Sequence, residues 1–512
     1  QQAVAWKVVG YQESTDGGVT FGPETTTKPT WLTSLSTTEG GGGTYPQQGN
    51  ATVQTATLID KLADYNAVLQ NATARGTASS PYDLSMHDFK GNPTAKRNTA
   101  NSYLISAPGW YKIPLVYGNA ITDGNPNPDS YTGPTAPVMY RGHDVALHHF
   151  KDHAGVDIDD PWITQTNGGV NAPDGANIVW TDQSGIVEVS SLGIEGSGTN
   201  AFVHFRVPQD KIRNGNAVIA VRKGNTVVWS WHLWFDHDDV LNILPPITNF
   251  QNQIYSFTKQ PLGLAYNKWE SSIYNKPRVV RIHVEQAIAN GSPAVKQKGT
   301  IDITQNPGSV KEFGTTFYQF GRKDAFPGTD AIADGSFNKN AGDNMSIING
   351  IQHPENFYIG QNSWNYYPPS SYSYFNLWSA KNTEVSNWFN DNPVIKTIYD
   401  PCPVGLKMPA SRAFTSFTLN GQSGGTPNVE GNWDMGYTFK SHSGTNTIFF
   451  LASGARNYTD GILVSKGHQG RYWAAVPRYT ESGCLFFFDV TTIYPLANTY
   501  RCHGFAVLPV IE

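Results

Sequence analysis

The sequence contains few charged residues. They occupy 15% of its 512 positions, against roughly 25% in an ordinary globular chain. The formal net charge is −5, so we expect no basic surface for phosphates and no nucleic-acid partner. No apolar run approaches the roughly 18 residues of a membrane-spanning helix, and we expect no transmembrane segment. The sequence also shows no internal repeat of the length used in solenoids.

Cysteine is scarce too, with Cys402, Cys484 and Cys502 all lying after residue 400. Their spacing does not match a zinc ribbon, and three cysteines form at most one disulfide. Two alternatives stay open: one disulfide with one free thiol, or three buried thiols. The first residues lack a basic and apolar leader, and alternation begins at once over 4–9. We therefore expect a processed N-terminus.

Turn-forming and aromatic residues are abundant instead. The chain has 50 Gly and 32 Pro, and aromatic residues make up 12% of it. Short strands joined by long, turn-rich loops have this composition. The sequence therefore predicts a mainly β extracellular protein, with the targeting segment already removed.

Three regions follow from the pattern along the chain. Residues 1–80 are rich in Gly, Thr and Ser, and form a partial or irregular β-rich segment with a short amphipathic helix over 57–70. Residues 81–245 predict a β-sandwich, because alternating strands are separated by Gly, Pro and Asn turns. The expected strands are 102–106, 109–116, 178–181, 185–189, 201–207, 216–222 and 226–235.

The clearest of these strands is 227–235, VVWSWHLWF. Large side chains fall on both of its faces, which predicts a central strand buried on both sides. A surface ladder of aromatic rings that binds sugars is the alternative for the same pattern.

Residues 250–512 predict a loop-rich α+β domain. The polar stretch 236–252 contains Pro245-Pro246 and is expected to be a linker that proteases cut early. A helix is expected over 383–390, with Thr383 as N-cap. The expected strands are 278–285, 299–304, 447–451, 471–476, 485–490 and 503–510.

The densest polar cluster lies between His143 and Asp160. His149 and His153 stand four residues apart, as two ligands on one helix face would, but Gly142, Gly155 and Pro161 disfavour a helix. Asp157, Asp159 and Asp160 lack the Gly and Glu of a calcium loop. We therefore expect a solvated loop without metal, and no cofactor elsewhere. Asp236–Asp239 are expected to form a polar hinge.

No catalytic motif stands out. A Gly-x-Ser-x-Gly elbow is absent, and acidic residues are sparse after position 360. Paired carboxylates far apart in the sequence remain open. The sequence favours binding over hydrolysis, and we expect no enzyme activity.

The leading candidate for ligand binding is the aromatic loop 363–378. Flat rings stack on sugar C–H faces, while Asn and Ser reach hydroxyl groups. The alternative is that these rings line the core. The six candidates are Trp364, Tyr366, Tyr367, Tyr372, Tyr374 and Trp378.

Several sequence strings carry a resemblance to known families. Residues 99–121, TANSYLISAPGWYKIPLVYGNAI, resemble a segment of the fimbrillin-like surface proteins of Bacteroidales, with Ser102 where that family usually has Cys. Residues 215–222 and WSWHLW at 229–234 fit the same family. A second resemblance is to the Fibrobacter succinogenes major paralogous domain, which is C-type-lectin-like. It is carried by residues 320–327 (FGRKDAFP), 399–405 (YDPCPVG) and 504–507 (GFAV).

The resemblance implies an exported protein at the bacterial cell surface, associated with the outer membrane or a pilus. It implies other pilin subunits as partners through strand donation, and a glycan or host surface protein as ligand. Residues 504–512 are expected to form a structural strand rather than one to donate, which favours a pilus-tip adhesin. A surface glycan-binding lipoprotein that serves a nutrient importer is the alternative. An enzyme of the formylglycine-generating type is disfavoured, because Cys484 and Cys502 are not a close pair.

Overall fold

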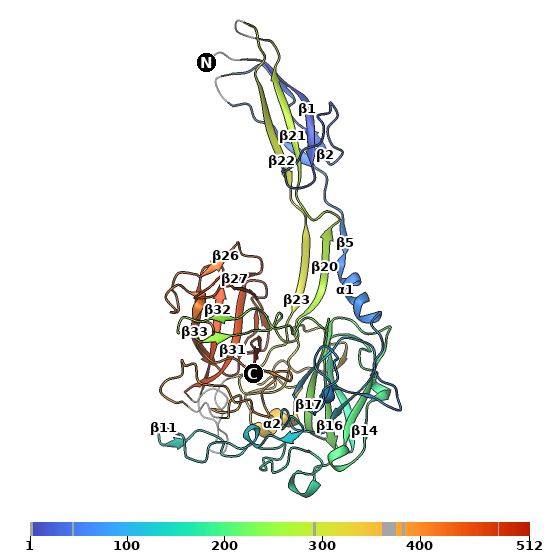
Figure 1. Cartoon of the computed structure of the whole chain (residues 1–512), viewed down its shortest axis with the longest axis vertical. Helices are drawn as coiled ribbons and strands as arrows, with labels where there is room; N and C mark the ends of the chain where they lie inside the picture. Colours follow the sequence, from blue (N-terminus) through green and yellow to red (C-terminus); the bar gives the residue numbers. More distant parts are fainter. Residues whose placement is uncertain (1–3, 44–45, 290–292, 361–374, 381–383, 480) are drawn as a thin grey trace. The chain divides into compact units, whose positions relative to one another are not determined.

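The computed structural model describes residues 4–43, 46–289, 293–360, 375–380, 384–479 and 481–512 (Figure 1). The protein is mainly β, with 38% strand and 7% helix, so the expected fold class is confirmed at that level. The chain divides into two compact units. Unit 1 comprises 1–64 and 267–312, and unit 2 comprises 65–266 and 313–512.

This division differs from the expected boundaries. Residues 267–312, expected in the C-terminal domain, belong with the N-terminal segment, because β21 pairs with β1 along nearly its whole length. The expected sandwich and the C-terminal region share one unit instead of two. A single hydrophobic core runs through both, from Trp229 and Trp231 to Trp473 and Phe505.

Unit 1 contains two facing sheets and part of a third. The larger sheet has the order β22(Lys298–Gln305)-β21(Arg278–Gln286)-β1(Trp6–Ser14)-β3(Glu39–Gly40). The smaller sheet pairs β2(Leu32–Leu35) with β4(Ala51–Val53), and Trp31 and Leu32 pack with Val280 and Ile282 between the two. The third sheet has the order β23(Ser309–Gly314)-β20(Ala265–Ser272)-β5(Leu58–Asp60). The expected strands at 4–9, 278–285 and 299–304 are thus confirmed.

The sandwich of unit 2 has two principal sheets. One has the order β24(Asp334–Gly335)-β13(Gly175–Thr181)-β16(Gly215–Lys223)-β17(Thr226–Phe235)-β7(Ser102–Ile105). The other has the order β14(Gly193–Glu195)-β15(Phe202–Val207)-β8(Gly109–Pro114)-β6(Tyr82–Asp83). Strand 226–235 lies between β16 and β7 and is buried from Val228 to Phe235. The prediction of a central strand is confirmed, and its rings are not a surface ladder.

The β16–β17 hairpin shows how local sequence sets the register. Lys223 pairs with Thr226, so only Gly224 and Asn225 form the turn. Gly224 has a φ of 58°, which a two-residue hairpin turn favours and which glycine adopts without steric strain.

The C-terminal region of unit 2 is built from short sheets. Its largest have the orders β31(Gln469–Arg478)-β32(Ser482–Asp489)-β33(Ile493–Tyr500) and β26(Val429–Glu430)-β27(Gly436–Lys440)-β28(Thr447–Leu451). Figure 1 shows these strands close together, over a second core that includes Phe414, Phe450 and Phe486. The remaining two-stranded pairs are β9(Ile121–Thr122)–β10(Asn125–Pro126), β11(Met139–Tyr140)–β12(His143–Asp144), β18(Ile247–Thr248)–β19(Ile254–Tyr255), β25(Leu406–Lys407)–β34(Val510–Ile511) and β29(Ala455–Arg456)–β30(Leu463–Val464).

The described helices are few. α1(Lys61–Gln70) forms the C-terminal part of the helix expected over 57–70, and α2(Ile347–Gln352) follows the N-cap Ser346. Residues 384–390 are not helical, contrary to prediction, because the Glu384 carboxylate accepts bonds from the backbone of Ser386 and Asn387. Such side-chain bonds compete with helix formation. Thr383 lies outside the described residues.

Two expected strands are also wrong. Residues 185–189 form turns that bury Ile186 and Val187. Residues 503–510 are largely irregular: isolated bridges join Gly504 to Arg456, Phe505 to Tyr318 and Ala506 to Tyr472. An irregular segment whose side chains are buried can show the same apolar sequence pattern as a strand, although its backbone forms no continuous ladder of hydrogen bonds.

The expected linker at 236–252 is packed into unit 2 through its buried residues, although Pro245 and Pro246 are exposed. Asp236, Leu241 and Asn249 are at most 1% exposed. The backbone is paired as well, through Leu244 N–H to the Phe257 carbonyl and Gln260 N–H to the Val240 carbonyl.

We therefore expect 236–252 to resist limited proteolysis, because cleavage requires local unfolding of about ten residues. Mass spectrometry of the first fragments from a brief digestion with an unspecific protease would locate the earliest cuts. An initial cut within 236–252, in protein that retains its native circular dichroism, would contradict this structure of the segment.

Candidate functional site

Most of the aromatic loop expected to bind ligand lies outside the described residues. This applies to Trp364, Tyr366, Tyr367, Tyr372 and Tyr374. Trp378 is described and is fully buried; its indole N–H donates to the Arg322 carbonyl at 3.2 Å. Its ring packs against Phe320 and Trp473. Trp378 is therefore a core residue without a free face for a sugar, which corrects its assignment as a binding residue.

The polar cluster between His143 and Asp160 folds as irregular chain with two short strands. His149 Nε2 lies at hydrogen-bond distance from the Ile158 carbonyl, and His153 is 6% exposed. Asp152 accepts bonds from the backbone N–H groups of Ala154 and Val156, and Asp159 accepts one from Asn167. These carboxylates stabilise turns.

The same region contains pairs rather than larger clusters. Asp144 contacts His148, and Lys151 contacts Asp157. Across the described residues, no group of three or more His, Cys, Asp or Glu side chains could hold a metal ion. All three cysteines are buried, and no disulfide joins one to another, in keeping with the alternative of three buried thiols.

Asp236, expected in a polar hinge, is instead a buried carboxyl group. It accepts hydrogen bonds from the Tyr65 hydroxyl and from the His237 N–H at 2.7 Å. Burial raises its pKa to about 7. Asp239 lies nearer the surface and pairs with Lys259.

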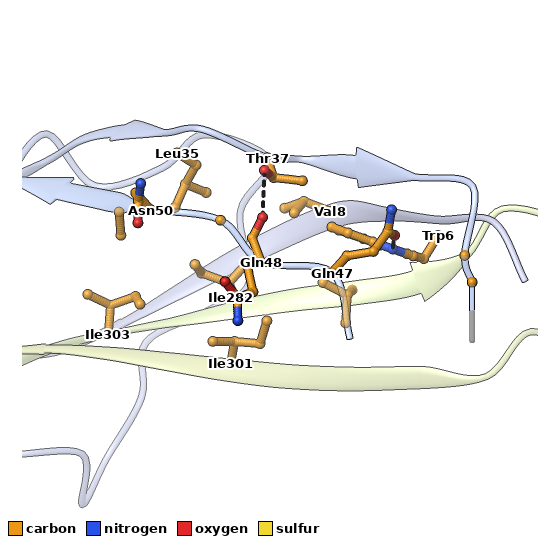
Figure 2. Close-up of a pocket in the computed structure, with 15 residues that line it drawn as sticks. Trp6, Val8, Leu35, Thr37, Gln47, Gln48, Asn50, Ile282, Ile301 and Ile303 are labelled. Atoms are coloured by element: carbon orange, nitrogen blue, oxygen red, sulfur yellow. Dashed lines mark hydrogen bonds between the residues drawn. The ribbon is translucent and has the colours of Figure 1, made fainter. Parts of the chain in front are cut away.

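Unit 1 contains a groove of about 410 Å³ between its two facing sheets. Figure 2 shows Ile282, Ile301 and Ile303 pointing from β21 and β22 into the same space as residues of segment 47–50. Trp6 and Val8 of β1 line the groove as well. We call it the unit 1 groove.

The register explains why these side chains share one face. Ile282 pairs with Ile301 and Val280 with Ile303, while Val8 pairs with Val284. Alternate residues of each strand therefore point toward the smaller sheet. Val280 and Ile282 are covered by Trp31 and Leu32, but Ile301 remains 52% exposed.

The exposed apolar surface results from a mismatch in sheet size. Four paired strands face only two, and neither β22 nor β4 has a second paired neighbour within the described residues. The polar rim is held in place by Gln47, which accepts a bond from the Trp6 indole, and by Thr37, which donates to the Gln48 carbonyl at 3.3 Å (Figure 2). The groove thus combines an apolar floor with free strand edges.

Sequence reasoning did not find this groove. Alternation at 278–285 and 299–304 predicted the two strands but not what would cover them. The informative signal was the apolar set Ile282, Val284, Ile301 and Ile303, combined with the scarcity of bulky apolar residues over 33–54 that could pack on it.

Comparisons with protein-family models, with curated proteins and with solved structures found no match. Within the described part of the chain, no helix has the length and hydrophobicity to cross a membrane.

Proposed function

We propose that this chain is a non-catalytic adhesin of the bacterial cell surface, a fimbrillin-like subunit at the tip of a pilus. In this proposal the unit 1 groove accepts an extended segment of a neighbouring subunit, and unit 2 carries the ligand-binding surface for a glycan or host protein. The resemblance of residues 99–121, 320–327 and 399–405 to surface-protein families supports this proposal.

The observation that carries the proposal is the incomplete cover of Ile301 and Ile303. An added strand would bury these side chains and pair with a free edge, as in other cases of strand addition. Backbone hydrogen bonds would supply affinity, and apolar side chains at alternate positions would supply specificity. The incoming segment would therefore alternate apolar and polar residues.

The C-terminal residues support a subunit that accepts rather than donates through this part of the chain. Segment 504–511 bridges to Tyr318, Arg456 and Tyr472, and its last strand pairs with Leu406 and Lys407. Donating it would break these contacts within unit 2.

The proposal predicts that Ile301→Asp prevents incorporation into surface filaments while leaving the monomer folded. Ile301 is half exposed, so its replacement removes little core packing, whereas a carboxylate in the groove would be buried by an incoming strand at a cost of several kcal/mol. Ile273→Asp is the matched control, because Ile273 is 71% exposed in the same unit and does not line the groove.

The measurement is immunogold labelling of surface filaments from the producing bacterium, together with the denaturation midpoint of each purified variant. We expect the wild type and Ile273→Asp to label filaments, and Ile301→Asp to remain unassembled with a nearly unchanged midpoint. Wild-type incorporation of Ile301→Asp would rule out strand acceptance in this groove. Surface display without any filament would favour the importer-associated lipoprotein instead.

A further inference from the structure

A second hollow, of about 210 Å³, lies on the sheet β31–β32–β33 of unit 2. Drug-sized ligands generally occupy about 300–1,000 Å³, so this hollow suits a smaller group. Arg471, Phe487, Tyr494, Asn498, Thr499 and Phe505 contribute to its lining. We call it the Arg471 hollow.

The two faces of this sheet have different roles. Tyr472, Phe486 and Phe488 are at most 1% exposed and belong to the second core. On the opposite face, Phe487 pairs with Arg471 on one side and with Tyr494 on the other. One face of the sheet therefore packs on the second core. The other packs in part on the core of Trp229 and Trp473 through Leu485, and leaves Tyr494 at the surface beside the half-buried Phe487.

The exposed rings form a surface for stacking. Tyr494 is 40% exposed, Phe487 is half-buried, and their ring centroids lie 5.8 Å apart at 37°. Asn498 and Thr499 line the hollow from the neighbouring strand. Thr499 pairs with Gly483 and so shares the face of Phe487, whereas Asn498 pairs with Cys484 of the second core. Flat apolar rings beside a hydroxyl match the alternating C–H and O–H groups of a sugar ring.

Arg471 adds a positive charge without a described acidic partner. Its Nη2 donates to Gln469 Oε1 at 2.7 Å, but its Nε is buried without a hydrogen-bond partner. No salt bridge joins it to a carboxylate of the described residues. A guanidinium group stays protonated in proteins and binds planar carboxylates with two parallel hydrogen bonds.

Two aromatic rings pack against Arg471, and among the described residues that line the hollow Arg471 is the charged one. Its Cζ lies 5.4 Å from the ring centroid of Phe487 and 5.7 Å from that of Phe505. His503 stacks on Phe505 and is neutral at physiological pH, because burial lowers its pKa to about 3. One fixed cation suits a single carboxylate better than a polyanion, which binds through several cations.

We propose that the Arg471 hollow binds a sugar that carries a carboxylate, such as a hexuronic acid or a sialic acid. The carboxylate pairs with Arg471, the ring stacks on Phe487 and Tyr494, and a hydroxyl meets Thr499. This assignment rests on the proposed ligand-binding role of unit 2 and is independent of strand acceptance by the unit 1 groove.

The test compares two sugars that differ in the carboxylate. Methyl β-glucuronide and methyl β-glucoside are titrated into the full chain and followed by ligand-observed NMR, with the methyl glycoside of N-acetylneuraminic acid as the second acidic probe. We expect at least one acidic sugar to bind about tenfold more tightly than the glucoside, as for one charge-assisted contact.

Variants assign the contacts. Arg471→Met removes the charge but keeps much of the packing, and is expected to abolish the preference for the acidic sugar. Phe487→Leu and Tyr494→Ala are each expected to lower the affinity for both the acidic and the neutral sugar about tenfold. The matched controls are Arg206→Met, at an exposed arginine paired with Glu188, and Phe449→Ala, at a ring that is 44% exposed on β28.

Equal affinity of wild-type protein for the acidic and neutral sugars would overturn the proposal without any variant. So would binding that sulfate displaces as well as free glucuronide does, because the hollow would then be a plain anion site. Unchanged binding by folded Arg471→Met would place the sugar elsewhere. Filament incorporation of Arg471→Met is expected to be normal, so failure here is distinguishable from failure of the proposed assembly.

Discussion

Replacing Asp324 by alanine is expected to lower the free energy of unfolding by about 3–5 kcal/mol, because it leaves a buried positive charge without its partner. The Asp324 and Lys323 side chains are 3% and 2% exposed, and Lys323 Nζ lies 2.6 Å from Asp324 Oδ1. Arg322, equally buried, lies 3.5 Å from the second oxygen. Solvent cannot replace the lost carboxylate at this depth.

The contacts of Lys323 explain why the effect reaches the centre of the sandwich. Its ammonium group donates to Ser230 Oγ at 2.6 Å and lies 4.6 Å from the ring centroid of Trp229. Ser230 in turn donates to Asp324 at 2.8 Å. Removing Asp324 therefore disturbs β17, the strand between β16 and β7.

Urea denaturation at neutral pH measures this loss. Asp239→Ala is the matched control, because it breaks a surface pair with Lys259 in which both side chains are more than 40% exposed; we expect a loss of at most about 1 kcal/mol. Burial already lowers the Lys323 pKa. Loss of the carboxylate should lower the Lys323 pKa further, so the deficit of Asp324→Ala should narrow as the pH rises toward the ordinary lysine value of 10.5, because the folded variant has then released a proton that the unfolded chain still holds. A deficit under 1 kcal/mol would contradict the importance of this ion pair.

Alternation in the sequence predicted most of the individual strands but not their assembly. Val228–Phe235 alternates between two bulky faces, and a central buried strand is the arrangement that satisfies both. The pairing of β1 with β21 joins residues more than 260 positions apart, and no local pattern identifies such a partner. Sequence alternation therefore groups residues 267–312 with the C-terminal region, whereas their contacts group them with residues 1–64.

Charge was the least reliable guide to location. Asp236 and Lys323 are polar in sequence and predict solvent exposure, yet both are buried. Each has a hydrogen-bond partner that is distant in sequence: the Tyr65 hydroxyl for Asp236, and Ser230 for Lys323 in addition to the adjacent Asp324. Partners so remote in sequence are visible only in the folded chain.

The sequence strings that suggested a family meet inside unit 2. Asn101 donates to the carbonyls of Ile398 and Asp400 at 2.6 and 2.8 Å, and its own carbonyl oxygen accepts from Trp229. The Trp180 indole donates to the Ala325 carbonyl at 3.1 Å. These strings therefore serve to join the sandwich to the C-terminal region, which is why they indicate an architecture and did not reveal a binding site.

Replacing Asp236 by asparagine is expected to stabilise the protein at pH 8 and to have little effect near pH 4. Burial, opposed by the Tyr65 and His237 hydrogen bonds, raises the pKa of Asp236 to about 7 from its ordinary value of 3.8. Between these values the folded state holds a proton that the unfolded state has released. Stability contributed by this group is therefore complete at low pH and falls as the pH rises toward 7.

The expected size of the stability difference follows from the interval between the unfolded and folded pKa values of Asp236. About three pH units at 1.36 kcal/mol each correspond to roughly 4 kcal/mol. Asparagine has the shape of the protonated carboxyl group and keeps an oxygen that accepts from Tyr65, but it carries no charge at any pH. Asp236→Asn removes the free-energy cost of burying a carboxylate. At pH 8 the free energy of unfolding of the variant should exceed that of the wild type by several kcal/mol.

The difference between variant and wild type isolates Asp236 from other titrating groups. Burial also raises the pKa of Asp182 to about 7 and lowers that of His232 to about 3. The pH dependence of the stability that His232 contributes is opposite to that of the two aspartates. This stability is lost as the pH falls below 6.5, the ordinary pKa of histidine. Both groups are present in variant and wild type alike, so their contributions cancel in the comparison.

Urea denaturation of both proteins at pH 4.5, 6 and 8 measures the effect, with Asp210→Asn, at a side chain that is 77% exposed, as the control. The stabilisation by Asp236→Asn should grow steadily with pH, while the control shows no such trend. Equal destabilisation at all three pH values would mean that the fold needs the carboxylate itself. The segment expected from its sequence to be a hinge would then be held by an ionised hydrogen bond to Tyr65, rather than by a neutral buried acid.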